Sequence, residues 1–110
     1  MPRGKTRKDG INMLSFENQN IEFKQEYVSD IRKEVIGFAN ADGGVVYVGI
    51  RKDGAVIGVE DPDPVMLQIV NSLKDSIAPD IMPFVKVQAE QMEGKHVDEI
   101  HVTTGTNRPY

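Results

Sequence analysis

The segment GFANADGGVVYVGI, residues 37–50, constrains the fold most strongly because its character changes at a pair of glycines. Phe38-Ala39 close a run with apolar residues at helical spacing, whereas the run after the glycines is rich in β-branched residues. That second run is apolar on both faces, which predicts a central, buried strand. The segment therefore predicts a helix that turns sharply into the middle of a sheet.

The glycine pair has two interpretations, a phosphate-binding loop or a tight turn. A phosphate loop uses backbone N–H groups at the N-terminus of a helix, where the dipole is positive. These glycines follow the C-terminal end of a helix instead, and no G-x-x-x-x-G-K-[ST] motif is present. We favour a structural turn that stops the helix, formed by Asn40, Asp42, Gly43 and Gly44.

The flanking sequence predicts further strands and helices. Asn20 to Gln25 alternates apolar and polar residues, as a strand with one buried face does. The helix over 30–40 has Ser29 as its expected N-cap. Asp53-Gly54 predicts a hairpin turn into a strand over 55–59. A second helix should begin near Pro62, with Asp61 or Asp63 as its cap.

The last part of the chain predicts a hairpin around Glu93-Gly94. Val97 is out of register with Ile100 and Val102, which predicts a β-bulge between them. The complete order is β-α-β-β-α-β-β, a two-layer α/β (α+β) domain. We expect residues 1–18 to form a flexible basic arm and residues 19–110 to form the domain, as the N-terminal piece of a longer regulator.

Composition narrows the functional classes. The chain has no cysteine, so disulfides and thiolate metal sites are excluded, and no apolar run is long enough for a transmembrane helix. The net charge is −4, but four of the 13 basic residues fall in the first eight positions, leaving 9 elsewhere against all 17 acids. The folded part therefore does not resemble a broadly basic DNA clamp. We expect a cytoplasmic protein.

An ordered set of motifs resembles a known family. The motifs are Glu17, Ile21-Glu22-Phe23-Lys24, Phe38-Ala39-Asn40, Asp42-Gly43-Gly44, Tyr47-Val48-Gly49-Ile50, Asp53-Gly54, Val56, Gly58-Val59 and the closing Arg-Pro-Tyr. Together they are similar to the Schlafen AlbA-2 domain, a DNA-binding module at the N-terminus of many bacterial transcriptional regulators. The resemblance implies an Alba-like fold and a homodimer. It also implies that ATP binding, where it occurs, belongs to a region beyond this chain.

The same resemblance offers an enzymatic alternative, a Mg²⁺- or Mn²⁺-dependent endoribonuclease. In nuclease members of the family, two glutamates and an aspartate hold the metal ion, and Glu17 and Glu22 match the glutamates. Convergent carboxylates suit such chemistry. The third position departs from the pattern, because Lys52 stands where the aspartate is expected and Asp53 comes one residue later. That departure makes metal binding the weaker hypothesis.

Our sequence-based prediction is a non-catalytic DNA-binding domain of a bacterial transcriptional regulator, with no cofactor of its own. The residues expected to contact nucleic acid are Lys24, Arg51 and Lys52, together with Arg3, Lys5, Arg7 and Lys8 of the arm. A third hypothesis is a dimerisation or ligand-sensing module, which the acidic folded part favours.

Overall fold

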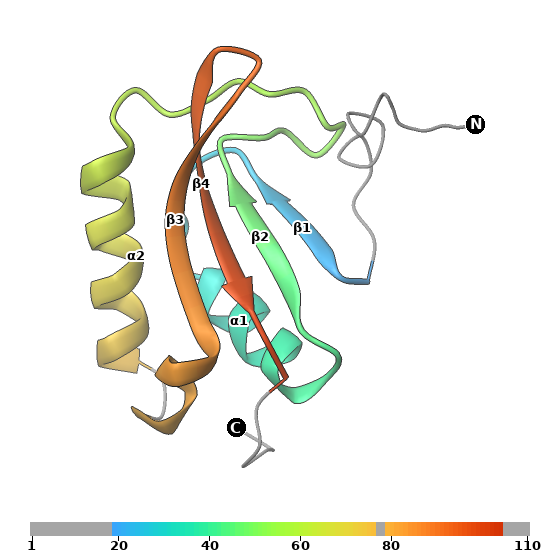
Figure 1. Cartoon of the computed structure of the whole chain (residues 1–110), viewed down its shortest axis with the longest axis vertical. Helices are drawn as coiled ribbons and strands as arrows, with labels where there is room; N and C mark the ends of the chain where they lie inside the picture. Colours follow the sequence, from blue (N-terminus) through green and yellow to red (C-terminus); the bar gives the residue numbers. More distant parts are fainter. Residues whose placement is uncertain (1–18, 77–78, 105–110) are drawn as a thin grey trace.

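The fold is described from a computed structural model, which covers residues 19–76 and 79–104. The predicted basic arm, residues 1–18, lies outside this range. The elements in chain order are β1 (Ile21–Lys24), α1 (Ile31–Asn40), β2 (Gly44–Val48), α2 (Pro62–Ser76), the 3₁₀ helix η2 (Pro79–Phe84), β3 (Val85–Met92) and β4 (Lys95–Val102) (Figure 1).

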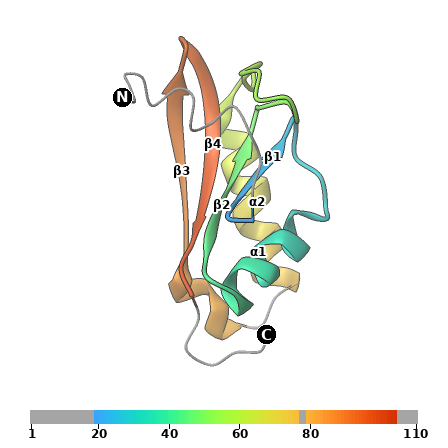
Figure 2. The same cartoon turned by 90° about the vertical axis from the view of Figure 1, so that its right-hand side faces the viewer.

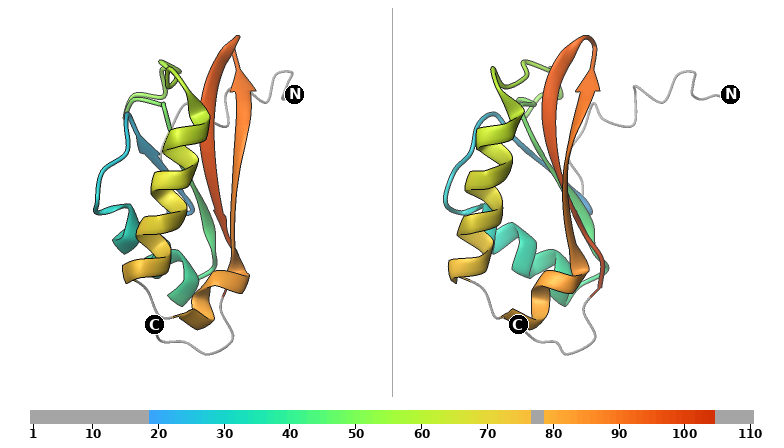
Figure 3. Two further views of the ribbon diagram at one scale, coloured as in Figure 1. Left: turned by 90° about the vertical axis from the view of Figure 1, so that its left-hand side faces the viewer. Right: turned by 60° about the vertical axis from the view of Figure 1, so that its left-hand side comes forward.

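The strands form one mixed sheet in the order β1-β2-β4-β3. β1 pairs with β2 in parallel, whereas β4 pairs antiparallel with both β2 and β3. Both α-helices lie on the same side of this sheet (Figure 2). α2 packs alongside β3 and β4 (Figure 3), and α1 packs against β2 and β4. The predicted two-layer α+β architecture is therefore confirmed, and so is the central position of β2.

The predicted order of elements is wrong at one point, because no strand forms over residues 55–59. Only two isolated bridges occur there, Ile50 with Val56 and Val59 with His96. The reason is that the chain reverses direction after β2. The N–H groups of Ile57 and Gly58 both donate to the carbonyl of Gly49, at 3.0 and 2.8 Å. Positive φ angles at Gly49 and Gly58, 113° and 77°, interrupt an extended strand. The observed order is β-α-β-α-β-β.

The predicted bulge in β4 is also wrong. The β3–β4 ladder is continuous, from Val85 opposite Val102 to Met92 opposite Lys95. Val97 differs in phase from Ile100 because the two side chains belong to hydrophobic clusters on opposite faces of the sheet. Burial on both faces of β4 explains the change of pattern without an extra residue.

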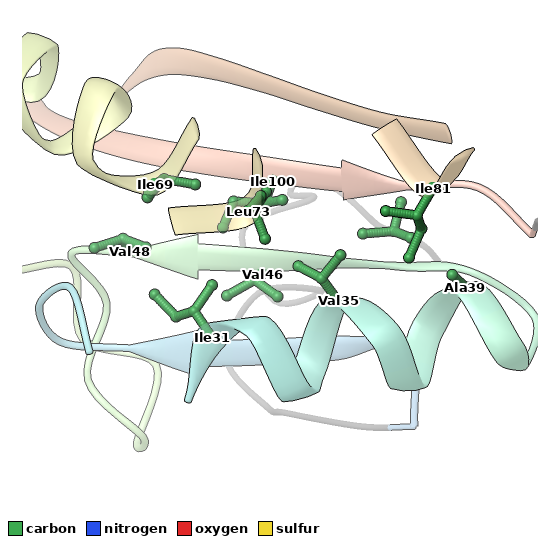
Figure 4. Close-up of a cluster of buried hydrophobic side chains, with 10 residues drawn as sticks. Ile31, Val35, Ala39, Val46, Val48, Ile69, Leu73, Ile81 and Ile100 are labelled. Carbon is green, nitrogen blue, oxygen red and sulfur yellow. The ribbon is translucent and has the colours of Figure 1, made fainter. Parts of the chain in front are cut away.

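The main core lies between the sheet and the helices. Its buried members are Ile31, Val35, Ala39, Val46, Val48, Ile69, Leu73, Ile81, Ile100 and Val102, most of which Figure 4 shows converging from both layers. A smaller cluster contains Phe23, Tyr47, Ile50, Val56 and Val97. Because the second cluster uses the other face of the same strands, the sheet is apolar on both sides near its centre.

The two helices begin differently. α1 has Asp30 as its N-cap, one residue later than the predicted Ser29, and the Asp30 side chain makes no capping hydrogen bond. α2 begins at Pro62, as predicted, and Asp61 Oδ1 accepts a hydrogen bond of 3.2 Å from the N–H of Asp63. Asp61 therefore satisfies one of the free backbone donors of the first turn.

Candidate nucleic-acid interface

The glycine pair forms a closely packed junction between α1 and β2. Gly43 has φ +81°, and its N–H donates to the carbonyl of Phe38 at 2.8 Å, closing the last turn of the helix. Asn20 Nδ2 donates to the carbonyl of Gly43 at 3.1 Å. At Gly44, a Cβ atom would lie 2.7 Å from the carbonyl oxygen of Asn20 and from the Phe38 ring. The close approach of the backbone at this point requires glycine.

The loop after β2 carries the cationic residues predicted to contact nucleic acid. It starts beside the end of β1, because the N–H groups of Gly49 and Ile50 both donate to the carbonyl of Lys24, at 2.7 and 3.2 Å. A tight turn follows, in which the Arg51 N–H donates to the carbonyl of Ala55 at 2.9 Å. We call residues 51–54 the cationic loop. Its backbone presents Arg51 and Lys52 to solvent, with side chains 50% and 63% exposed.

Each exposed cation in the cationic loop has an acidic partner. Lys52 Nζ lies 2.6 Å from Glu22 Oε2 on β1. Arg51 forms two hydrogen bonds to Asp53, including 3.2 Å from Nε to Oδ1. The Arg51 guanidinium, helped by the backbone N–H of Ala55, lowers the pKa of the Asp53 carboxyl to about 2. The same pairing raises the pKa of Arg51 above its ordinary value.

Lys24 occupies a different environment from the other two cations. Its side chain is only 11% exposed, and Nζ lies 3.4 Å from both Asp30 and Glu34 and 3.7 Å from Glu22. Three carboxylates from β1, the following turn and α1 therefore surround one ammonium group. This arrangement joins the edge of the sheet to the start of the helix, and it limits access to Lys24 from solvent.

Two of the three acidic residues of the nuclease alternative, Glu22 and Asp53, are engaged in ion pairs. Glu22 contacts the ammonium groups of Lys24 and Lys52, and Asp53 is held by Arg51. Glu17, the third residue, lies outside the described range. Within residues 19–76 and 79–104, no three His, Asp or Glu side chains are grouped closely enough to hold a metal ion.

The fold and these motifs together match one known family. The family model described as Schlafen, AlbA_2 matches residues 17–110. The chain belongs to the Schlafen AlbA-2 family. No curated protein matches this AlbA-2 domain.

Two solved structures share the fold of the AlbA-2 domain. One is the N-terminal domain of a RecG-related protein from Nitrosomonas europaea, whose name relates it to ATP-dependent DNA helicases. It is 25% identical, with a TM-score of 0.65 over 86% of this chain and 70% of that one. The other is the DIP2311 protein from Corynebacterium diphtheriae, 25% identical with a TM-score of 0.60 over 83% of this chain. The AlbA-2 domain covers only 19% of that protein.

Sequence reasoning missed a polar cluster on the helix-free face of the AlbA-2 sheet. Glu99 is buried, and its Oε1 lies 2.8 Å from His101 Nε2 and accepts a hydrogen bond of 3.0 Å from Gln88 Nε2. Burial, and then the nearby Glu99 charge, raise the pKa of Tyr47. His101 and Gln88 also line a shallow hollow with Lys86. The Glu-x-His spacing was a usable signal, because residues two apart on a strand share a face.

Asp98 is a further residue that the sequence analysis did not single out. It is fully buried, and neither carboxylate oxygen has a hydrogen-bond partner among the described residues. Burial, and then the Asp63 charge on α2, raise the pKa of its carboxyl to about 6 against the opposing effect of His96. In the described part of the AlbA-2 domain, no helix has the length and apolar character needed to cross a membrane.

Proposed function

We propose that this AlbA-2 domain binds nucleic acid, specifically DNA, as the N-terminal domain of a bacterial transcriptional regulator, and that it has no catalytic activity of its own. Membership of the AlbA-2 family supports this function. Similarity to a domain of a protein named for its relation to a DNA helicase supports it further. The specific ligand, DNA rather than RNA, is part of the proposal.

The observation that carries the proposal is the pair of exposed cations, Arg51 and Lys52, on one short loop. Phosphate contacts from such side chains position a protein on the nucleic-acid backbone. Their acidic partners do not prevent this, because exposed ion pairs contribute only about 0–1 kcal/mol in water. Replacing a carboxylate partner by a phosphate therefore costs little free energy. Until the ligand binds, Asp53 holds the Arg51 guanidinium in place.

The other predicted contacts have different roles in the proposal. Arg3, Lys5, Arg7 and Lys8 would add contacts from a segment outside the described residues. Lys24 is enclosed by three carboxylates, so we propose that it orients Glu22 and the start of α1 and contributes less directly to phosphate binding. The proposal also includes a homodimer and a cytoplasmic location, where bacterial DNA is found. Any ATP-binding region would lie beyond this chain.

The test is DNA affinity as a function of salt concentration. Replacing Arg51 and Lys52 together by alanine should weaken binding and reduce the salt slope by about 2, since each phosphate contact contributes roughly 0.9. Lys33→Ala with Lys74→Ala is the matched control, because it removes the same charge from exposed positions on α1 and α2. An equal loss in both double variants would contradict a specific role for the cationic loop. Undetectable DNA binding at low salt would contradict the function itself.

The endoribonuclease alternative is the weaker proposal because the carboxylates of Glu22 and Asp53 are both engaged by cations. It predicts Mn²⁺-dependent RNA cleavage that disappears in Glu22→Ala. The dimerisation or ligand-sensing alternative predicts a stable oligomer without nucleic-acid affinity. RNA cleavage and salt-dependent DNA binding, measured on the same purified protein, distinguish the three functions.

A further inference from the structure

β3 is an edge strand whose outer row of backbone groups has no strand partner among the described residues. One of these groups, the Gln91 N–H, donates a 3.3 Å hydrogen bond to Glu90 Oε1, which pairing with a second strand would replace. Within the described part of the chain, β3 pairs only with β4 and ends the sheet. The Thr103 N–H donates to the carbonyl of Phe84 at 2.9 Å, and these residues continue the β3–β4 register. Hydrogen bonding alternates along an antiparallel ladder, so even-numbered residues of β3 bond to β4. The backbone groups of Val85, Val87, Ala89 and Gln91 therefore point away from the sheet.

Side chains along β3 alternate in the same way. Gln88 bonds to Glu99 on the helix-free face, so Lys86 and Glu90, two residues away in each direction, lie on that face too. Val85 and Val87 pack against the main core on the helical face. Lys86 and Glu90 are both exposed. The outer edge of the sheet thus carries one cation and one anion, placed symmetrically about Gln88.

This symmetry makes the edge complementary to itself. Two antiparallel copies of β3, related by a two-fold axis at Gln88, place Lys86 of each copy opposite Glu90 of the other. The same register pairs Val87 with Ala89 and Val85 with Gln91, whose backbone groups are the outward-pointing ones. Four such residue pairs supply about eight backbone hydrogen bonds. A shift of two residues in either direction separates Lys86 from Glu90, so the charges select this register.

We infer that the edge of β3 binds a second copy of this chain, giving a continuous eight-stranded sheet across a two-fold axis at Gln88. The inference specifies the homodimer of the proposed function and does not depend on DNA binding. β3 has no proline within its eight residues to block pairing. The alternative role for Lys86 and Glu90 is protection of the edge against association, and that role predicts a monomer.

The test is charge reversal measured by analytical ultracentrifugation of the full 110-residue chain. Lys86→Glu or Glu90→Lys alone places two like-charged pairs in the interface, and each should weaken dimerisation at least tenfold. The double variant Lys86→Glu with Glu90→Lys restores both pairs and should recover the dimer. Lys74→Glu, on the exposed surface of α2, is the control for the change in net charge. The two single reversals shift the net charge in opposite directions, so weakening by both would not follow from a general charge effect.

Ala89→Pro provides an independent test that leaves the charges unchanged. The Ala89 N–H points away from β4, so proline removes a donor only from the proposed interface. We expect a folded monomer, with the fold checked by circular dichroism. A dimer that persists in Ala89→Pro and in both charge reversals would overturn this interface but leave the proposed homodimer intact. A monomeric wild-type chain at about 100 μM, in the weak range for protein association, would overturn both. DNA affinity measured on the same samples tests the nucleic-acid function separately.

Discussion

Lys52 and Glu22, which are 30 residues apart in the chain, form an ion pair of 2.6 Å between the cationic loop and β1. The contact depends on the parallel pairing of β1 with β2, which brings the end of β1 beside the loop. Glu22 is therefore a competitor for the cation that we propose binds phosphate. Its carboxylate reduces the positive potential of the loop.

We predict that Glu22→Gln increases DNA affinity severalfold at low salt, since it removes a negative charge from the cationic loop. Asp75→Asn, at an exposed position on α2, removes the same charge elsewhere and should have a smaller effect. Titrations with a fluorescent duplex would measure both. Reduced binding by Glu22→Gln would mean that Glu22 organises the loop more than it competes with the ligand.

The environment of Lys24 leads to a stability prediction. Lys24→Met leaves the carboxylates of Glu22, Asp30 and Glu34 without their shared cation, so the free energy of unfolding should fall by about 1–2 kcal/mol. Lys33→Met, at an exposed position on α1, should change it by less than about 0.5 kcal/mol. Urea unfolding monitored by circular dichroism measures both values. If Lys24→Met and Lys33→Met are equally stable, the contacts of Lys24 are fully replaced by contacts with water.

The buried carboxyl of Asp98 leads us to expect an unusual pH dependence of the free energy of unfolding. Its folded pKa of about 6 lies above the ordinary value of 3.8, so the folded state binds a proton more tightly than the unfolded state. The proton on Asp98 therefore stabilises the folded state fully below pH 3.8, and this stabilisation is lost as pH rises through 6. Asp98→Asn should therefore gain up to about 3 kcal/mol over wild type at pH 7, following 1.36 kcal/mol per pKa unit. This advantage should shrink towards pH 4.

Thermal or urea unfolding of wild type and Asp98→Asn between pH 4 and 7.5 checks that difference. The charged groups near Asp98 are Asp63 on α2 and His96 on β4, while its strand neighbours are Val48 and Ala89. Asp63→Asn should lower the pKa of Asp98 and reduce the pH dependence. A stability difference that is constant over this range would contradict the buried ionisation.

Two glycines in neighbouring elements should respond in opposite ways to alanine. Gly44→Ala places a Cβ 2.7 Å from the Asn20 carbonyl oxygen and the Phe38 ring, so the variant should lose about 1–3 kcal/mol. Gly37, on the exposed side of α1, has no described atom within 4 Å of an added Cβ apart from its chain neighbours and the nearby backbone of its own helix. Gly37→Ala should gain about 0.5–1 kcal/mol from its better helix propensity. Melting temperatures of the two variants should therefore bracket that of the wild type.

The sequence predicted those elements whose determinants are local. β2 was recognisable because its residues are apolar on both faces, and α2 because Asp61 and Pro62 mark its start. The strand predicted over 55–59 failed because Gly58, read as part of an extended run, has a positive φ and joins a backward turn. Val97 was misread as a bulge because a second cluster on the other face was not anticipated.

The candidate site was harder to predict because its contacts are long-range. Arg51 and Lys52 were identifiable as loop residues, but their acidic partners differ in kind. Asp53 is a local partner that a turn motif suggests, whereas Glu22 reaches Lys52 only through strand pairing. The engagement of Glu22 and Lys24 therefore could not be deduced from spacing along the chain.

The pairing of β2 with β4 also determines when this domain can fold. Gly44 lies opposite Val102, and Val48 opposite Asp98, so the centre of the sheet joins segments that are synthesised far apart. Contacts between such distant segments make folding slow compared with helical proteins of similar size. A nascent chain that ends before β4 has its first three strands but lacks the strand that holds β2 and β3 together. We therefore expect cooperative folding only after residue 102 has left the ribosome, with no stable subdomain before that point.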